Sequence, residues 1–451
     1  MNLEHFKEIL TKNAIYLYPN IRISNEISFP GPDLVVLNDD GTMNAKGDQS
    51  SDLGYRISRE QPFLPNDVNL LKIFIEENNT IESYTNIGQE YKDAFKSTSL
   101  TKAISMTLSP KSSSTILNVI DALSHMAERT YEGEPIRIGV IINDVLSVSN
   151  KKSNLLFSNF IQANYAAVLT NGSETFIEID SDGYIYRYLQ LNSEKSELGL
   201  APYDYTSVIQ YIGKDTIGIA LSNKGELLIF HDNELKYTKR GDRWNPYNHS
   251  QTIKAIHERS ENDNLMFARA VYLTALDISF GKSGGIISFL DENEVRNALA
   301  HINIHDIVNE KYYNIKRELM KEQDDPEYDR IKDLSFEKFL EQRENSKSSM
   351  LNKLISEKKF FLLSRKLRQE ITSIDGATIV DYNGDVVACG AIVKIEAGSL
   401  GGGRIAAART LSHYGIAIEI SSDSSIKGFA LDASGEPERI FTIADFGEDY
   451  S

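Results

Sequence analysis

The stretch from Leu400 to Arg409 has the residue types of a phosphate-binding loop. Three consecutive glycines, Gly401 to Gly403, form a loop that only glycine can bend tightly, and this loop enters a segment with strong helix propensity. Backbone N–H groups at a helix start, with Arg404 beside them, form a site for phosphate oxygens. The chemistry indicated is the binding of a phosphate-bearing ligand.

A second stretch, Asp375-Gly376-Ala377, precedes this loop and gains its meaning from the elements around it. The segment ending at Asp381 predicts a strand, Asn383-Gly384 a hairpin turn, and the residues from Asp385 to Ala391 a second buried strand. After Arg404 we expect a helix through Leu411 and then a strand from Gly415 to Ile420 that ends in polar residues. This layout brings strand ends and a helix N-terminus to one edge of a sheet, where ligands of open α/β sheets bind. By itself, Asp375 would be a turn carboxylate at a strand start.

These residues resemble the diadenylate cyclase domain, the nucleotide-binding fold of the DNA-integrity-scanning protein family. Asp375-Gly376-Ala377 matches the family's Asp-Gly-Ala strand, and Gly402 to Ala408 matches in part its Gly-x-Arg-His-Arg-Ala-Ala loop. Ile420 to Asp423 falls where the family has a Ser-Glu-Glu strand end. The resemblance covers roughly residues 255 to 435 and is specific over the last third. It implies a mixed sheet flanked by helices.

The resemblance also implies roles for single residues. In the family, the aspartate holds a divalent metal, Mg²⁺ or Mn²⁺, and helps to activate a ribose 3′-hydroxyl, while the Arg-His-Arg loop binds the triphosphate of ATP. Asp375 and Arg404 are therefore the catalytic candidates, and Asp375 and Asp423 are the candidate metal ligands. The candidate nucleotide-binding residues are Gly376, Ala377, Gly402, Gly403, Arg404, Arg409, Ser421 and Ser422.

Three positions depart from the family pattern. Ile405 replaces the histidine, Ala406 the second arginine and Ser422 the first glutamate. Arg409, one turn inside the helix, either faces solvent or replaces the lost arginine. Because cations spread the charge of a transferring phosphoryl group, these losses should slow chemistry more than they weaken binding.

Three functions follow from this pattern. The first is a divergent diadenylate cyclase-type domain that binds an adenine nucleotide, ATP or cyclic di-AMP, and acts as a nucleotide sensor; the residue losses favour it. The alternative is an active diadenylate cyclase that converts two ATP to cyclic di-AMP, which implies a homo-oligomer with facing nucleotide sites. A third alternative is a structural adaptor with a decayed site.

The composition bounds the class of protein and its partners. The chain has 451 residues, of which 41% are hydrophobic, and a formal net charge of −17. This charge argues against nucleic acid or an anionic membrane as the main partner, since phosphates need basic patches. No apolar run approaches the roughly 20 residues needed to cross a bilayer. The single cysteine, Cys389, lies in a predicted apolar strand, which indicates a packed thiol. One cysteine allows no internal disulfide, so we expect a cytoplasmic protein. The family resemblance implies that it is bacterial.

The pattern along the chain predicts an α/β fold in two parts. Residues 1–250 form an α/β module with β-hairpins, one of which turns at Asp182-Gly183, and we expect this module to report on nucleotide occupancy. Residues 251–451 form the diadenylate cyclase-like domain. A charged stretch, 309–347, interrupts that domain and predicts a solvated helical arm.

One further pair of residues has a spacing that suggests a metal. His301 and His305 are one helical turn apart, as zinc ligands can be, but no glutamate follows His301 and no cysteine is near. We expect two surface histidines.

Overall fold

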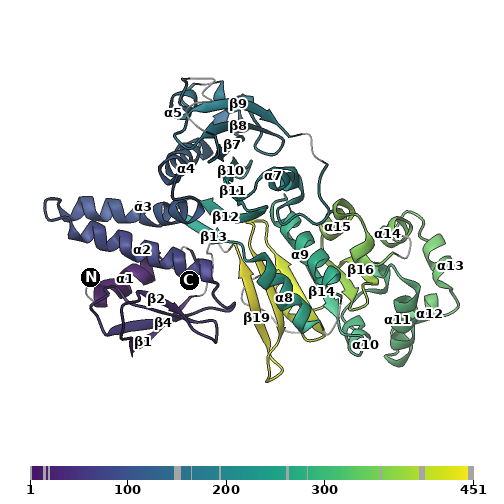
Figure 1. Cartoon of the computed structure of the whole chain (residues 1–451). Coiled ribbons are helices and arrows are strands. Elements are labelled where there is room, and N and C mark those ends of the chain that lie inside the picture. The colour runs from purple at the N-terminus through teal and green to yellow at the C-terminus, as the bar shows by residue number, and fades with distance from the viewer. Residues whose placement is uncertain are drawn as a thin grey trace. The chain divides into compact units, whose positions relative to one another are not determined.

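The computed structural model describes residues 3–13, 17–18, 21–146, 154–163, 165–191, 194–260, 264–281, 283–355, 358–395 and 402–444. The chain divides into two compact units, Met1–Tyr247 and Asn248–Ser451 (Figure 1). Both units contain sheets flanked by helices, so the predicted α/β fold is confirmed. Among the described residues, no helix is both long enough and apolar enough to span a membrane.

The first unit begins with a small antiparallel sheet and three long helices. The sheet has the order β1 (Arg22–Ser28), β4 (Leu53–Ser58), β3 (Met43–Ala45) and β2 (Val35–Leu37). The helices are α1 (Leu3–Asn13), α2 (Pro65–Ser83) and α3 (Gln89–Leu108). One apolar core joins these elements to the larger sheet that follows them in the chain.

That larger sheet has seven strands. Their order is β13 (Arg243–Pro246), β12 (Glu234–Arg240), β11 (Leu227–His231), β10 (Thr216–Leu221), β7 (Ile138–Asn143), β8 (Thr175–Asp180) and β9 (Ile185–Gln190). Only β7 and β8 are parallel to each other, and the predicted turn at Asp182-Gly183 joins β8 to β9. The elements that flank or connect the strands are α4 (Ser113–Ala127), β5 (Thr130–Tyr131), β6 (Glu134–Pro135), α5 (Phe157–Phe160), α6 (Ala166–Leu169), η3 (Tyr203–Tyr205) and α7 (Thr206–Tyr211).

The second unit is built on a mixed six-stranded sheet. Its order is β16 (Val386–Ala391), β15 (Ala377–Asp381), β14 (Gly285–Leu290), β17 (Gly415–Ile420), β18 (Ile426–Leu431) and β19 (Pro437–Ile443). β14 and β15 are parallel, and all other neighbours are antiparallel. β14 is buried along its whole length because helices cover both faces of the sheet. The helices of this unit include α8 (His249–Arg259), α9 (Leu265–Ser279), α15 (Arg365–Thr372) and α16 (Gly403–Ser412).

The connection from β14 to β15 contains the charged stretch 309–347. It forms α10 (Val295–Leu299), η4 (Ile304–Asp306), α11 (Glu310–Glu322), α12 (Tyr328–Ile331), α13 (Phe336–Glu341), α14 (Lys347–Ile355) and η5 (Phe360–Leu362). The stretch is helical as predicted, but the expectation of a solvated arm is wrong. Tyr312, Tyr313 and Phe339 are buried in the same core as Ile286 and Ile379 of the sheet. The charged residues lie on the opposite sides of these helices. Their number made the whole stretch look solvated, although one face of each helix is apolar.

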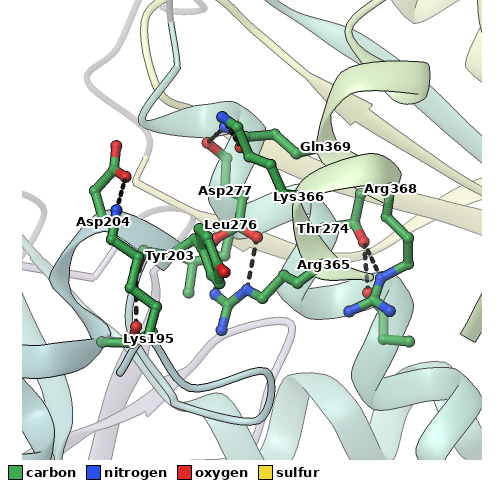
Figure 2. A network of polar contacts seen from close by, with 12 residues as sticks. Lys195, Tyr203, Asp204, Thr274, Leu276, Asp277, Arg365, Lys366, Arg368 and Gln369 are labelled. Carbon is green, nitrogen blue, oxygen red and sulfur yellow. Dashed lines mark hydrogen bonds and ion pairs between the residues drawn. The ribbon is translucent and has the colours of Figure 1, made fainter. Parts of the chain in front are cut away.

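A buried ion pair joins the two helices that lead into the parallel strands. Arg365 on α15 donates from Nε and Nη2 to the two carboxylate oxygens of Asp277 on α9, both at 2.7 Å (Figure 2). One turn later on α15, Gln369 donates to the Asp277 carbonyl oxygen at 3.2 Å. Arg368 donates to the Thr274 hydroxyl at 3.2 Å. Because α9 precedes β14 and α15 precedes β15, these contacts hold the starts of both strands at one edge of the sheet.

Candidate functional site

Most of the predicted site residues lie at that edge of the six-stranded sheet. Ile286 of β14 pairs with Ala377 of β15, so Asp375 and Gly376 lie beside Gly284. Gly285 pairs with Ile420, the last residue of β17, which places the turn that follows β17 at the same edge. α16 packs on β14, β17 and β18 and leads into β17, so its first turn also lies here.

One feature of the edge differs from the expectation. The parallel strands β14 and β15 both begin at this edge, whereas open α/β sheets bind ligands beyond the carboxyl ends of their parallel strands. The only strand of the central three that ends here is β17, which is antiparallel to β14. A ligand site at this edge would therefore depend on the helix start and on the end of β17.

Arg404 extends from the first turn of α16 over the start of β14. A Cβ atom at Gly284 would lie 2.6 Å from Nη1 of Arg404 and 2.5 Å from the carbonyl oxygen of Ile420. Only glycine therefore leaves room for the guanidinium at this place. The Arg404 side chain is exposed and, within the described part of the chain, has no hydrogen bond or ion pair. Its charge is available to a ligand.

The N-terminus of α16 adds backbone donors beside this guanidinium. Gly402 precedes the helix with φ +88° and ψ 168°, a conformation restricted to glycine. No side chain among the described residues caps this helix start. Gly402 and Gly403 are exposed, and the N–H groups of a first helical turn have no intrahelical acceptors. Leu400 and Gly401, which belong to the predicted loop, lie outside the described residues.

Asp375 and Gly376 form the adjoining part of the edge. Gly376 has φ +108°, and a Cβ atom there would lie 2.5 Å from the carbonyl carbon of Gly390 on β16, so glycine is required for this close approach. The Asp375 carboxylate is exposed and has no hydrogen bond or ion pair to another described residue. Ala377, in contrast, is buried in the core and contributes packing.

The predicted third segment is a tight turn between β17 and β18. The Ser421 N–H donates to the Ser425 carbonyl oxygen at 2.9 Å, and the Asp423 carboxylate accepts from the Ser425 N–H at 3.1 Å. Ser422 is exposed at the tip of this turn. Asp423 thus shapes the turn, in addition to being a candidate ligand.

Three predicted or replaced positions, Arg409, Ile405 and Ala406, do not add a charge at the helix start. Arg409 lies over the ring of Phe429, 5.9 Å from its centroid, and is five residues from Arg404, about 7 Å along the helix axis. The structure therefore does not bring Arg409 beside the glycine loop. Ile405 packs against the core and Ala406 is buried, so Arg404 is the only arginine in the described first turn.

The sequence analysis missed two charged residues near this edge. Lys347 donates to the Gly390 carbonyl oxygen at 2.5 Å and pairs with Asp306 at 2.7 Å, and Gly390 is also the residue against which Gly376 packs. Glu419 is only 4% exposed and lies opposite Lys427 on β18. The sequence could have indicated Glu419, because a glutamate is unusual inside the apolar run of Gly415 to Ile420. Nothing in the sequence distinguishes Lys347 from the other charged residues of its stretch.

The fit of a divalent cation depends on Asp375. In the part of the chain that the structure describes, no group of three or more His, Cys, Asp or Glu side chains could hold a metal ion. Mg²⁺ usually keeps several waters and binds through one or two carboxylates together with substrate phosphates. An exposed, unpaired Asp375 fits an ion that arrives with a nucleotide.

The other candidate residues have structural roles. His301 is buried rather than exposed as predicted; its Nδ1 and Nε2 lie 3.0 Å from the Lys394 carbonyl oxygen and 2.8 Å from the Tyr414 hydroxyl. His305 stacks on Phe339. Cys389 is buried, as predicted for a packed thiol, and burial raises its pKa to about 12.

Comparison of the chain with models of known protein families, with curated proteins and with solved structures found no match.

Proposed function

We propose that the edge formed by Asp375, Gly376, Gly284 and the start of α16 binds an adenine nucleotide, and that the protein is a nucleotide sensor of the diadenylate cyclase type. The observation that carries this proposal is a pair of opposite charges without internal partners. Arg404 and Asp375 are exposed at one sheet edge beside a glycine-rich helix start. Within the described residues neither charge has a partner, so the guanidinium can contact phosphate and the carboxylate can contact the cation that accompanies it.

The arrangement assigns a role to each residue. Phosphate oxygens accept hydrogen bonds from the N–H groups of the first turn of α16 and from the Arg404 guanidinium. Asp375 binds the Mg²⁺ or Mn²⁺ that accompanies a nucleotide, and this ion neutralises phosphate charge. The choice of an adenine nucleotide, ATP or cyclic di-AMP, rests on the resemblance of Asp375-Gly376-Ala377 and Gly402 to Ala408 to the diadenylate cyclase family.

A sensor is favoured over an enzyme because the first turn of α16 offers one cationic side chain. Ile405 and Ala406 pack toward the core, and Arg409 lies over Phe429, away from the helix start. Each missing cation costs several kcal/mol of transition-state stabilisation, about 3–4 kcal/mol for a single well-placed donor. Binding tolerates such a loss better than phosphoryl transfer does. In this proposal the first unit reports nucleotide occupancy.

An active diadenylate cyclase is the second candidate, and one observation favours it. Within the described residues the Asp375 carboxylate is exposed and unpaired, so it is available to hold a catalytic ion. This function requires two sites to face each other in a homo-oligomer, because the 3′-hydroxyl of one ATP attacks the α-phosphate of the other.

Two measurements test the proposal and separate the two candidates. Isothermal titration of the full chain with ATP and with cyclic di-AMP, each with Mg²⁺, should show binding of at least one of them. Incubation with labelled ATP and Mn²⁺ or Mg²⁺, followed by chromatography, should show no cyclic di-AMP. Product formation would establish the cyclase, and absence of binding by both nucleotides would refute a nucleotide site.

A further inference from the structure

The large sheet of the first unit repeats the topology of the sheet in the second unit. In each, a central strand is parallel to one neighbour and antiparallel to the other, and antiparallel hairpins complete both sides. The first repeat, in the order β12-β11-β10-β7-β8-β9, matches the second repeat, β19-β18-β17-β14-β15-β16, strand for strand. In both repeats a helix, α4 or α9, precedes the central strand.

The registers of the two repeats agree at single residues. Ile138 pairs with Leu221, and the equivalent Gly285 pairs with Ile420. The ladder between β11 and β12 is irregular at Ile229 and Phe230, and the ladder between β18 and β19 is irregular at the equivalent Gly428 and Phe429. Conserved bulge positions of this kind are specific features of a fold rather than chance irregularities.

The hairpin turn beside the central strand is also the same. Asp180-Ser181-Asp182-Gly183 is equivalent to Asp381-Tyr382-Asn383-Gly384. The Gly183 N–H donates to the Asp180 carbonyl oxygen at 3.0 Å, and the Gly384 N–H donates to that of Asp381 at 2.9 Å. Gly183 and Gly384 have φ of +87° and +86°.

A short helical segment binds this turn in both repeats. The Phe157 N–H donates to the Gly183 carbonyl oxygen at 2.9 Å, and the Phe360 N–H donates to the Gly384 carbonyl oxygen at 2.7 Å. The residue that follows is therefore equivalent in the two repeats: Ser158 in the first and Phe361 in the second.

This one position differs in a way that leaves space in the first repeat. The Phe361 ring covers Gly384, since a Cβ atom there would lie 2.7 Å from its Cε1, and its centroid is 6.3 Å from that of Phe267 on α9. At Gly183 no ring of a described residue takes this place: the nearest described atom to such a Cβ, at 3.7 Å, is the Thr115 Cγ2. A pocket of about 560 Å³ opens here between α4, α5 and the turn.

The lining of the pocket suits a planar ring with polar substituents. Val119, Met126 and Ile179 are buried and form an apolar floor, whereas Asp121, Asp182 and Arg129 stand at the rim. The volume lies within the range of roughly 300–1,000 Å³ that ligand pockets have. The lining also holds the imidazole of His125, 3.8 Å from the Asp121 carboxylate. With that imidazole neutral, two carboxylates and one guanidinium give the rim one net negative charge.

We propose that the first unit binds a small aromatic amine in this pocket, with the ring over Gly183 in the position that the Phe361 side chain takes in the second repeat. The second repeat shows which group fits, because its own chain supplies a phenyl ring there. The acidic rim favours a cationic substituent over an anionic one. This site is distinct from the nucleotide edge, which attracts anions.

The test uses tryptamine as the probe and the full chain at pH 8, with ligand-observed NMR as the readout. Tryptamine should bind the wild type, and indole-3-acetate, which has the same ring and the opposite charge, should bind more weakly. Ser158→Phe places a phenyl ring in the pocket, as in the second repeat, and should remove tryptamine binding.

The matched control is Asn159→Phe, which adds the same ring at the next exposed residue, outside the pocket lining. It should bind tryptamine as the wild type does. Both positions are exposed, so both variants should fold, which circular dichroism checks. Unchanged tryptamine binding in Ser158→Phe, no binding by the wild type, or a preference for indole-3-acetate would each overturn the proposal.

Discussion

The guanidinium of Arg404 on α16 occupies the space that a side chain at Gly284, before β14, would need. A Cβ atom at position 284 would lie 2.6 Å from Arg404 Nη1 and 2.5 Å from the Ile420 carbonyl oxygen. The guanidinium can move, but the backbone of β17 cannot. We therefore expect Gly284→Ala to weaken nucleotide binding and to lower the free energy of unfolding by about 1–3 kcal/mol.

Calorimetric titration and urea denaturation measure the two effects of Gly284→Ala. The control is Gly213→Ala in the first unit, where an added Cβ atom meets nothing within 4 Å. A Gly284→Ala variant with the nucleotide affinity of the wild type would show that the position of Arg404 is unimportant for the ligand.

Removing the Arg404 side chain tests its contact with phosphate directly. Arg404→Ala should weaken the binding of ATP or cyclic di-AMP by about 1.5–3 kcal/mol, the scale of a charge-assisted hydrogen bond. Arg409→Ala removes the same charge from the same helix, but over Phe429, and should change the affinity little. Equal losses in the two variants would point to a general effect of net charge instead of a specific contact.

The Asp375→Asn variant distinguishes an enzyme from a sensor. If the wild type makes cyclic di-AMP, Asp375→Asn should abolish product and spare metal-independent nucleotide binding, because the carboxylate holds the ion that activates the 3′-hydroxyl. If the protein is a sensor, both proteins lack product in the labelled-ATP assay, and only metal-dependent binding falls. Rapid product formation by Asp375→Asn would show that the Asp375 carboxylate is not needed for catalysis.

Restoring the family's histidine alone should not restore chemistry. Ile405→His places an imidazole where the Ile405 side chain packs against the core, so any residual activity should stay at the level of the wild type. Ala406→Arg is not a useful addition, since Ala406 is only 5% exposed and its environment would have to rearrange around an arginine. Chromatography of labelled products compares the variant with the wild type.

The burial of α11 predicts a stability effect that a solvated arm would lack. Tyr313 is fully buried against Phe336 and Phe339, so Tyr313→Ala should lower the free energy of unfolding by about 3–5 kcal/mol in urea. Leu354→Ala in the neighbouring helix α14 removes an exposed side chain and should have an effect within about 0.5 kcal/mol. A small effect of Tyr313→Ala would instead support a solvated arm.

Glu82 gives the first unit an acid-sensitive contact. Hydrogen bonds from Lys96 and then from His5, opposed by burial, lower the pKa of Glu82 to about 2. Since the folded-state pKa is below the ordinary value near 4.3, this stabilisation is present above about pH 4.3 and is lost as the pH falls to about 2. Urea unfolding at pH 7 and pH 3 should show a larger acid-induced loss in the wild type than in Glu82→Gln; equal losses would contradict the contact.

Local sequence determined the elements whose conformation depends on near neighbours. Asp182-Gly183 and Asn383-Gly384 predict the hairpins found, because glycine takes the left-handed backbone that these turns require. Gly402 to Arg404 likewise predicts a loop that enters a helix, and α16 begins at Gly403. The sequence also predicts that Arg404 and Asp375 belong to one nucleotide site, and this stays a prediction.

Tertiary structure alone decided which of these residues meet. Arg404 reaches Gly284 because β14 pairs with β17, and Asp375 adjoins them because β14 also pairs with β15 across an inserted helical segment. The burial of Tyr313 and the place of Lys347 depend on the same long-range packing. The repeat of the sheet in the first unit was also hidden, because buried strands need only apolar residues of suitable size. Many sequences satisfy that requirement, so strand order and register emerge only when distant segments pair.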